Sequence, residues 1–329
     1  MSFPLSRRQF LAAAAAAGAS LTLPSTALAQ SFPEKGKPIK AVLPSPVGSA
    51  TDGMARAYGQ ALTEILATSV VVDNRPGAEG VIGVMAVKTA PADGYTMLVT
   101  SLSSMVVNPH LFKQLSYDPL TDFIPIAGTI KNTAILAVGP SIPFKSAREF
   151  LAAAKQNPGK YTYASVSAYT RLAGHMLMKA AGVTLLNVPY KNIGDLFSNW
   201  LAGSVDVMIA DVATFKAFFA KGIRPVAVAA TTRLPSLPNV PTFQEEGVAG
   251  LDISGWFAAY VPAGTPAPVV AKLRDAFKQA ARSKVVNDYI NNNGVEPFEL
   301  AGDELATFQR AEYEKWGRAV RDAGMVGTL

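Results

Sequence analysis

The chain has 329 residues, of which 49% are hydrophobic, and its 30 basic and 24 acidic side chains give a formal net charge of +6 at pH 7. This length exceeds one ordinary hydrophobic core and predicts two lobes or domains. No cysteine is present, which excludes disulfides, thiol nucleophiles and thiolate metal sites. The two histidines, His110 and His175, lack any zinc-binding spacing, and the basic residues form no run, so we expect neither a metal centre nor a nucleic-acid partner.

The N-terminal segment has the pattern of an export signal. Arg7 and Arg8 precede an apolar run over residues 11–23, which is followed by Ala27-Leu28-Ala29. We interpret residues 1–29 as a twin-arginine-type signal peptide that is cleaved near Ala29/Gln30. The alternative is an uncleaved anchor, but the run is shorter than the roughly 20 apolar residues that cross a bilayer. The expected localisation is the periplasm, with a mature charge near +4 once the two arginines are removed.

Short apolar runs alternate with helical patterns along the rest of the chain. Strands are expected over 39–43, 70–72, 96–100, 134–138, 161–164, 185–188, 205–209, 226–229 and 257–261. Helices are expected over 52–67, 81–90, 147–156, 170–181, 195–201, 214–219, 269–281, 284–291 and 304–322. Ser146 and Glu149 are expected to form a capping box at the third of these helices. The alternation predicts an α/β fold with mainly parallel sheets flanked by helices.

Two stretches, 128–137 and 251–256, are candidates for the places where the chain changes lobe. Lobe 1 would then be discontinuous, with residues 31–131 and 252–329, and lobe 2 would comprise residues 132–251. Two α/β lobes joined by two crossing segments form a hinged cleft, which is a common site for small ligands.

The loop after the first strand is the first candidate binding site, because ligands of open α/β sheets lie beyond the carboxyl ends of strands. Gly48 precedes Ser49-Ala50-Thr51-Asp52, which fits the pattern S-x-x-D. Ser49 and Asp52 would either cap the helix or contact a ligand directly. The N–H groups of Ala50 and Thr51 are unpaired donors at a helix start, where an anion is stabilised.

The loop after the third strand carries Ser101, Ser103 and Ser104. Their hydroxyls would either donate to a carboxylate or cap the next segment. This loop is the second candidate for contact with the ligand.

The candidates in the second lobe follow two of its strands. Ser165, Ser167, Tyr169 and Thr170 belong to a loop that would face the first lobe, and the next residue is Arg171. The Arg171 guanidinium would either hold a carboxylate with two parallel hydrogen bonds or lie on a solvated helix face.

Asp211 is the other second-lobe candidate and follows the strand expected to end at residue 209. It would either accept a hydrogen bond from a ligand or cap the helix that follows it.

The sequence offers little for catalysis. It contains no G-x-S-x-G elbow and no Gly-rich phosphate loop of either common type. We therefore expect no catalytic residue and no cofactor.

Four groups of motifs, taken together, resemble the Bug-type substrate-binding proteins of tripartite tricarboxylate transporters over essentially the whole mature chain. They are PVGSATD at 46–52 with AR at 55–56, NRPG at 74–77 with DGYT at 93–96, VPYK at 188–191 with GSVD at 203–206, and LPNVPT at 237–242 followed by WF at 256–257 and PAGTP at 262–266.

The resemblance implies a two-lobed type II periplasmic binding protein fold and a non-enzymatic receptor. Such a receptor captures a small organic carboxylate, whether mono-, di- or aromatic, by lobe closure and delivers it to a membrane permease. It implies that one carboxylate rests on the loop at 48–52 with donors from the loop at 101–104, and that the loop at 165–171 sets the distal end of the pocket. We expect a monomer. The competing functions are a secreted enzyme of the same fold that acts on an organic acid, and a ligand-sensing partner of a membrane sensor.

The chain departs from the family pattern at several positions. Ser49 and Glu79 occupy places where the family usually has glycine, and the loop at 165–171 is shorter and ends in Arg171 instead of histidine. Two hypotheses concern the distal end: Tyr169 narrows the cleft or stacks on an aromatic acid, and Arg171 binds a second carboxylate.

Overall fold

The computed structural model describes residues 32–190 and 193–329. The predicted signal peptide, residues 1–29, lies outside the described residues. Within the described ranges, no helix has both the length and the apolar character needed to cross a membrane.

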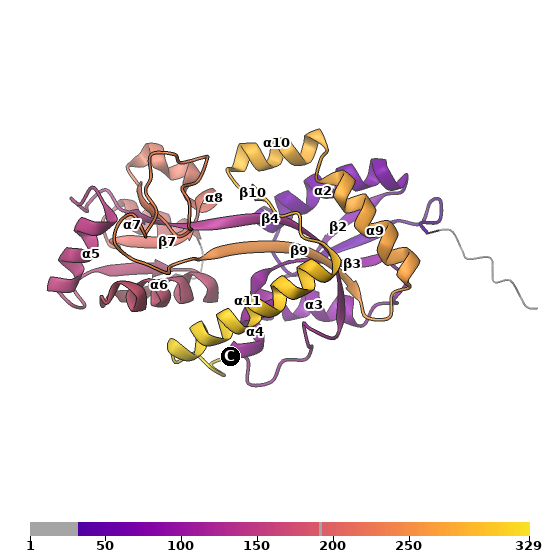
Figure 1. The fold of residues 1–329 in the computed structure, drawn as a ribbon, viewed down its shortest axis with the longest axis horizontal. Helices are drawn as coiled ribbons and strands as arrows, with labels where there is room; N and C mark the ends of the chain where they lie inside the picture. The colour runs from indigo at the N-terminus through magenta and orange to yellow at the C-terminus, as the bar shows by residue number, and fades with distance from the viewer. Residues whose placement is uncertain (1–31, 191–192) are drawn as a thin grey trace, which may run out of the picture.

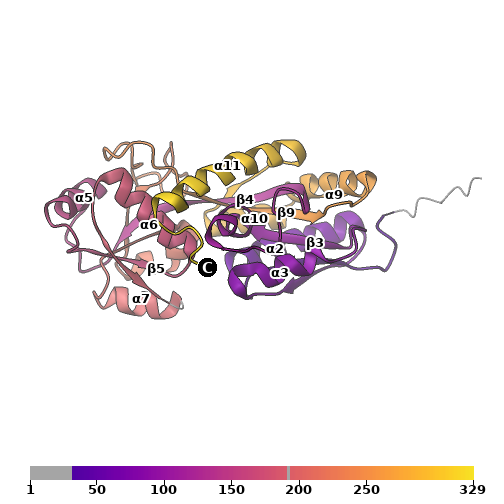
Figure 2. The ribbon, with the colours of Figure 1, turned by 90° about the horizontal axis from the view of Figure 1, so that it is seen from below.

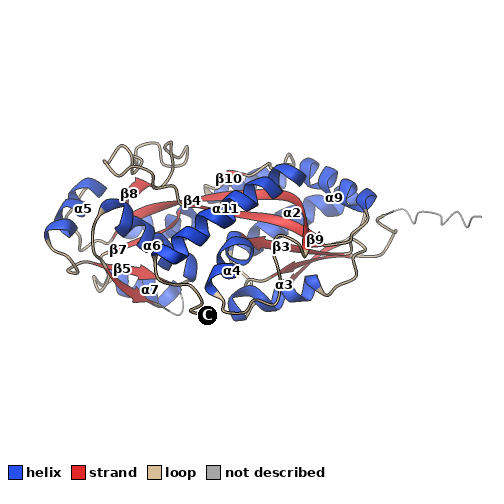
Figure 3. Cartoon of the chain, turned by 60° about the horizontal axis from the view of Figure 1, so that its bottom comes forward, coloured by secondary structure: helices blue, strands red, loops and turns tan. Residues whose placement is uncertain are grey.

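The molecule is elongated, with two sheet-containing parts side by side along its long axis (Figure 1). Strands β4 (Phe123–Val138) and β9 (Ser254–Pro262) run between the two parts (Figure 3). The pairing of β4 changes along its length: Thr133 still pairs with Ser254 of β9, and Ala134 pairs with Asp211 of β7. We call the part that contains the first strands lobe 1 and the part beyond Ala134 lobe 2.

The sheet of lobe 1 has the order β2-β1-β3-β9-β4. Strand β1 pairs in parallel with β2 and β3, and β9 is antiparallel to β3 and β4. The short strand β10 pairs with β4. The elements of this lobe are β1 (Ile39–Leu43), α2 (Ala50–Leu66), β2 (Val70–Asn74), η1 (Ala78–Gly80), α3 (Val81–Lys88), β3 (Thr96–Ser101), η2 (Ser103–Val107), α4 (Asn108–Leu111), α9 (Ala267–Ala280), α10 (Lys284–Asn293) and β10 (Glu296–Pro297).

The sheet of lobe 2 has the order β4-β7-β5-β6, and β8 also pairs with β4. Strand β5 is parallel to β6 and β7, whereas β7 and β8 are antiparallel to β4. The elements are α5 (Ala147–Gln156), β5 (Thr162–Ser165), α6 (Ala168–Ala181), β6 (Leu186–Pro189), α7 (Ile193–Leu201), β7 (Val207–Asp211), α8 (Val212–Phe215), η3 (Lys216–Lys221) and β8 (Arg224–Val228). The last helix, α11 (Gly302–Asp322), lies along both lobes (Figure 2).

The hydrophobic core is continuous on one face of the sheets and divided on the other. On the face covered by α3, α5, α6 and α11, one cluster extends from Val42 and Leu98 in lobe 1 to Leu136 and Phe150 in lobe 2. On the opposite face, α2, α9 and α10 cover a core in lobe 1, and α7, α8 and η3 cover a separate core in lobe 2. On this second face the two cores are separate, so the lobes can part there without breaking a shared core.

The α/β class is confirmed, and the sheets are mixed rather than mainly parallel. The antiparallel pairs all involve β4 or β9, the two strands that run between the lobes. The largest difference is in β4, which begins at Phe123 instead of residue 134. Pro125 and Gly128 interrupt its apolar pattern, and the register with β9 shifts after each of them, between Pro125 and Ala127 and between Gly128 and Lys131.

Candidate functional site

The loop between β1 and α2 has the cap predicted for Ser49. The Ser49 hydroxyl accepts from the N–H of Asp52 at 3.2 Å, and Ser49 has extended backbone angles. Gly48 has a φ of +81°, a conformation that side chains rarely adopt.

Asp52 does not complete the predicted capping box. Its Oδ2 accepts from the Gly48 N–H at 3.0 Å, while the N–H of Ser49 donates to the carbonyl of Pro46. Arg56 and Asn74 also donate to the Asp52 carboxylate. Burial alone would raise the pKa of Asp52, but the hydrogen bonds from Arg56, Gly48 and Asn74 outweigh it and lower this pKa below its usual value. The Asp52 carboxylate holds the loop in place and does not line the cavity described next.

The N–H groups of Ala50 and Thr51, the first two residues of α2, are unpaired donors. No protein acceptor for either N–H is found in the described part of the chain. They point out of the N-terminal end of a 17-residue helix, where the partial charge is positive. The sequence prediction of a pair of available amide donors is consistent with this geometry.

A cavity of about 640 Å³ lies between the lobes at this helix end. Gly48, Ser49 and Ala50 line it from lobe 1, and Ser167, Tyr169, Thr170 and Asp211 line it from lobe 2. The structure thus brings seven of the predicted residues together around one space. The other described lining residues are Gly53, Val166, Ile193, Gly194, Phe197, Met208, Ala210, Thr214, Phe218, Tyr289 and Asn293.

The remaining hydroxyl candidates surround a smaller, polar cavity of about 100 Å³ within lobe 1. Thr51, Ser101, Ser103 and Ser104 line it, together with Pro44, Ser45, Glu79 and Thr100. The Ser104 hydroxyl accepts from Thr100 at 3.1 Å, whereas the buried Oγ of Ser45 has no partner among the described residues. The loop from Pro44 to Thr51 borders both cavities. The serine hydroxyls lie on the side of the smaller cavity, and the start of α2 with its amide donors lies on the side of the interlobe cavity.

In lobe 2, the predicted loop largely forms the start of α6. Ser167 and Thr170 form a capping box, with the Thr170 N–H donating to the Ser167 Oγ at 3.3 Å. Ser165 is buried and donates to the Asn187 side chain at 2.8 Å, so it does not reach the cavity.

Tyr169 has its ring in the wall of the interlobe cavity and its hydroxyl turned into the protein. Burial raises the pKa of this phenol, and the carboxylates of Asp211, Asp252 and Glu312 raise it further. Within the described ranges, its hydroxyl has no hydrogen-bond partner. The ring packs against Trp316 of α11, with 5.8 Å between the ring centroids.

Arg171 does not line either cavity. Its Nε is buried without a partner in the described part of the protein, and the side chain lies near Tyr163 and His175, on whose pKa values it acts. Helix α6 begins at Ala168, two residues before the predicted start, and each residue of a helix turns by about 100°, so Thr170 faces the cleft and Arg171 is rotated away from it. The structure therefore does not place the Arg171 guanidinium at the distal end of the pocket.

Asp211 has the capping role that was one of its two predicted alternatives. Its Oδ1 accepts from the N–H and the hydroxyl of Thr214, both at 3.0 Å. It also lines the interlobe cavity, so capping and ligand contact are compatible at this residue.

The sequence analysis missed the aromatic walls of the cavity. Tyr289 of α10 donates to the Ala50 carbonyl at 2.9 Å, and burial raises the pKa of its phenol to about 12. A Cβ on Gly53 would lie 2.9 Å from the Tyr289 ring, so this glycine is what allows α2 and α10 to approach. Phe197 and Phe218 come from α7 and η3. In the sequence, these two residues are marked only by their place on the apolar face of a helix, and ordinary core residues have the same pattern.

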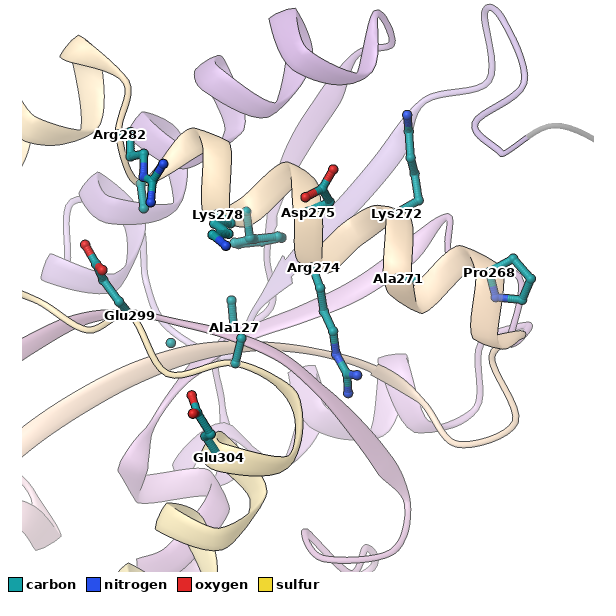
Figure 4. A pocket seen from close by; sticks show the side chains of 14 residues that line it. Ala127, Pro268, Ala271, Lys272, Arg274, Asp275, Lys278, Arg282, Glu299 and Glu304 are labelled. Atoms are coloured by element: carbon teal, nitrogen blue, oxygen red, sulfur yellow. The ribbon is translucent and has the colours of Figure 1, made fainter.

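A larger cavity of about 760 Å³ lies elsewhere, between α9 and the start of α11 (Figure 4). Its lining comes from lobe 1 alone, with Lys272 and Lys278 on α9, Arg282 just after it, and Glu299 and Glu304 opposite. Closure of the lobes cannot enclose it. We therefore take the interlobe cavity as the candidate ligand site. No group of His, Asp or Glu side chains suited to a metal ion is found among the described residues.

Comparisons with known proteins identify the family of the chain. The family model described as "Tripartite tricarboxylate transporter family receptor" matches residues 54–325, and a twin-arginine translocation signal model matches residues 4–24. A UPF0065 protein from the tcbD-tcbE intergenic region of a Pseudomonas species is 33% identical over 320 residues, which cover 96% of this chain and 94% of that protein. BugT of Bordetella pertussis is 30% identical over 292 residues, with 88% and 90% covered.

Solved structures show the same fold over nearly their full length. An R. palustris protein, Rpa4515, solved with adipate, has a TM-score of 0.80 at 28% identity and covers 90% of this chain and 99% of its own. The periplasmic binding protein BugD has a TM-score of 0.77 at 29% identity, with 90% and 99% covered. MatC from Rhodopseudomonas palustris, with bound malate, has a TM-score of 0.75 at 26% identity, with 88% and 100% covered.

These matches confirm the predicted fold and family, and the signal match confirms the prediction of export to the periplasm. The relatives are solute-binding receptors and not enzymes. The chain therefore belongs to the receptor family of tripartite tricarboxylate transporters and is a periplasmic solute-binding protein.

Proposed function

We propose that the protein captures a small organic carboxylate between its lobes and delivers it to a membrane permease of the tripartite tricarboxylate type. The related structures with adipate and malate support a carboxylate ligand. The family description supports a permease as the partner.

The observation that carries this proposal is the pair of unpaired N–H groups at Ala50 and Thr51. An anion that leaves water needs hydrogen bonds in its new site, or its burial costs several kcal/mol. Helix N-termini supply such bonds together with a positive partial charge and without burying a full counter-charge. The hydroxyls of Ser101, Ser103 and Ser104 lie on the other side of the same loop as further donors.

Lobe closure is supported by the composition of the cavity wall, which comes from both lobes. We assign residues 31–131 and 252–329 to lobe 1 and residues 132–251 to lobe 2, as the sequence predicts. A ligand that contacts both walls binds the closed form more tightly than the open form, which is the condition for it to drive closure.

Replacing Ala50 with proline tests the role of the amide donors. Ala50 is the first residue of α2, where proline is well tolerated, and Ser49 already has the extended backbone that precedes proline. The substitution removes one N–H and leaves the helix intact. A charge-assisted hydrogen bond contributes about 1.5–3 kcal/mol, so we expect the best-bound acid of a panel of benzoate, malate and adipate to lose roughly 10- to 150-fold in affinity by calorimetry.

The matched control is Ala50→Gly, which keeps the N–H and should bind nearly as well as the wild type. Circular dichroism and the melting temperature of the ligand-free variants show whether the fold is retained. Equal affinity of Ala50→Pro and Ala50→Gly for every acid would contradict the assigned donor. Delivery is tested separately by uptake of the labelled acid in cells with and without this gene.

A further inference from the structure

The interlobe cavity has aromatic side chains on both of its walls. Tyr289 contributes from lobe 1, and Tyr169, Phe197 and Phe218 contribute from lobe 2. The rings of Phe197 and Phe218 are stacked, with 3.5 Å between centroids and 4° between planes. Trp200 and Phe215 pack behind Phe197 and hold it in place.

Aliphatic side chains also line the cavity. They are Val166, Met208, Ala210 and Ile193, and Ile193 remains 42% exposed. Large apolar side chains left in contact with water in a concave site are typical of ligand pockets. This part of the lobe 2 wall thus suits an apolar body, next to the polar side chains of Ser167, Thr170 and Thr214.

The described lining offers no counter-charge for a second carboxylate. The charged side chain in the described lining of the interlobe cavity is Asp211. In the smaller cavity lined by Ser101, Ser103 and Ser104, it is Glu79. Neither described lining includes a lysine or arginine, and Arg171 lies outside both. The contrast is with the cavity on α9, where four basic side chains are present.

We propose that the ligand is an aromatic monocarboxylate, with its carboxylate at the start of α2 and its ring between Tyr289 and the Tyr169–Phe218 wall. This inference rests on the carboxylate-binding function proposed above. A second carboxylate on the distal end of a ligand would meet the Phe197–Phe218 wall and the Asp211 carboxylate, with no basic side chain in the described lining, and an ionised group is costly there. An aromatic ring gains both apolar burial and edge or face contacts there.

This assignment also explains how the ligand couples to closure. The carboxylate contacts lobe 1 in either form, whereas the ring reaches Phe218 and Tyr169 only when lobe 2 approaches. The ring contacts therefore supply the difference in affinity between the two forms that closure requires.

The test measures binding of benzoate, cyclohexanecarboxylate, adipate and malate to the mature protein by calorimetry. We expect benzoate to bind at least about tenfold more tightly than adipate or malate, since an unpaired carboxylate in an apolar site costs more than 1.4 kcal/mol. Cyclohexanecarboxylate has the same charge and a similar size without the aromatic faces. It should bind several-fold more weakly than benzoate, roughly 3- to 10-fold.

Phe218→Leu should lower the affinity for benzoate about 3- to 10-fold and leave that for cyclohexanecarboxylate nearly unchanged. The matched control is Phe219→Leu, because Phe219 packs against the lobe 2 core and does not line the cavity. This control should keep the wild-type affinity for benzoate. Melting temperatures of the ligand-free variants show that both fold.

The outcomes separate this inference from the function on which it rests. Tighter binding of adipate or malate than of benzoate overturns the aromatic assignment and leaves carboxylate capture standing. Equal effects of Phe218→Leu and Phe219→Leu on benzoate also overturn it. Binding of none of the four acids overturns both proposals.

Discussion

The two faces of the sheets join the lobes in different ways. On the α11 face, buried side chains of both lobes form one continuous core, and Trp316 of α11 packs against Tyr169 of lobe 2. On the α10 face, the cores of the two lobes are separate, and the ligand cavity lies between them. Contact across that face is local, as where the Lys216 ammonium donates to the Asn292 carbonyl.

This difference indicates where the molecule resists opening. Side chains of a shared core cannot separate without exposing apolar area, at about 25 cal/mol per Å². A few polar contacts across the cleft exchange with water at little cost. The α11 face should therefore act as the hinge side and the α10 face as the mouth.

The largest effect is expected from Trp316→Ala. Trp316 is fully buried, and its Nε1 donates to Glu312 at 3.0 Å. Loss of a buried tryptophan costs about 3–5 kcal/mol of the free energy of unfolding, which urea denaturation measures. Because this core is shared, amide hydrogen exchange should rise in both lobes.

The matched control is Trp200→Ala, which removes an equally buried tryptophan from the core of lobe 2 alone. Exchange should then rise in lobe 2 and not in lobe 1. The same exchange pattern in both variants would contradict the distinction between a shared and a divided core.

An intermediate effect is expected from protonation of His110 on the shared face. Burial lowers the pKa of this imidazole below its ordinary value of 6.5 and Arg321 adds to the shift, while the Tyr313 carbonyl and Glu314 oppose it. Between the lowered pKa and 6.5, the unfolded chain binds the proton and the folded protein does not. The free energy of unfolding should therefore be fully retained above pH 6.5 and fall as the pH drops below it.

His110→Gln tests this assignment in urea titrations between pH 7.5 and 5, a window chosen around the ordinary histidine pKa of about 6.5. The variant should lose part of the pH dependence while the wild type keeps it. Identical slopes for the two proteins would show that His110 does not contribute. His175, whose pKa is also lowered by burial and by Arg171, accounts for a further part.

The smallest effect is expected from Lys179→Ala. Lys179 of α6 forms an ion pair with Asp322 of α11, and both side chains are largely exposed. Exposed pairs contribute at most about 1 kcal/mol and are screened by salt. The difference in unfolding free energy between this variant and the wild type should disappear in 1 M NaCl. A difference that persists would contradict the conclusion that the shared core, and not this ion pair, holds α6 against α11.

Local signals in the sequence predicted most of the secondary structure. The helix expected over 147–156 has those bounds, because Ser146 accepts from the Glu149 N–H at 3.1 Å. The Glu149 carboxylate accepts from the Lys145 N–H at 2.8 Å instead of from the N–H of the cap residue Ser146, so the box is incomplete. The first part of β4 was missed, since its pattern depends on pairing with β9, about 130 residues later in the chain.

The candidate site was predictable where it depends on helix starts. Ser49, Ala50, Ser167 and Thr170 occupy such positions, and the structure places all four on the interlobe cavity. Tyr289 and Phe218 were not predictable, since only tertiary packing brings α10 and η3 to the α2 start. Arg171 shows where this reasoning stops: helix α6 begins at Ala168, and Thr170 lines the interlobe cavity whereas Arg171 does not.

The single strand that serves both sheets has a consequence for the integrity of the protein. Residues 123–133 of β4 are hydrogen-bonded into one sheet and residues 134–138 into the other, with no irregular segment between them. A protease therefore meets no exposed connector at this crossing between the lobes. Severing the strand would strip each half of an inner member of its sheet and leave bare backbone edges, so neither fragment should persist as a folded unit.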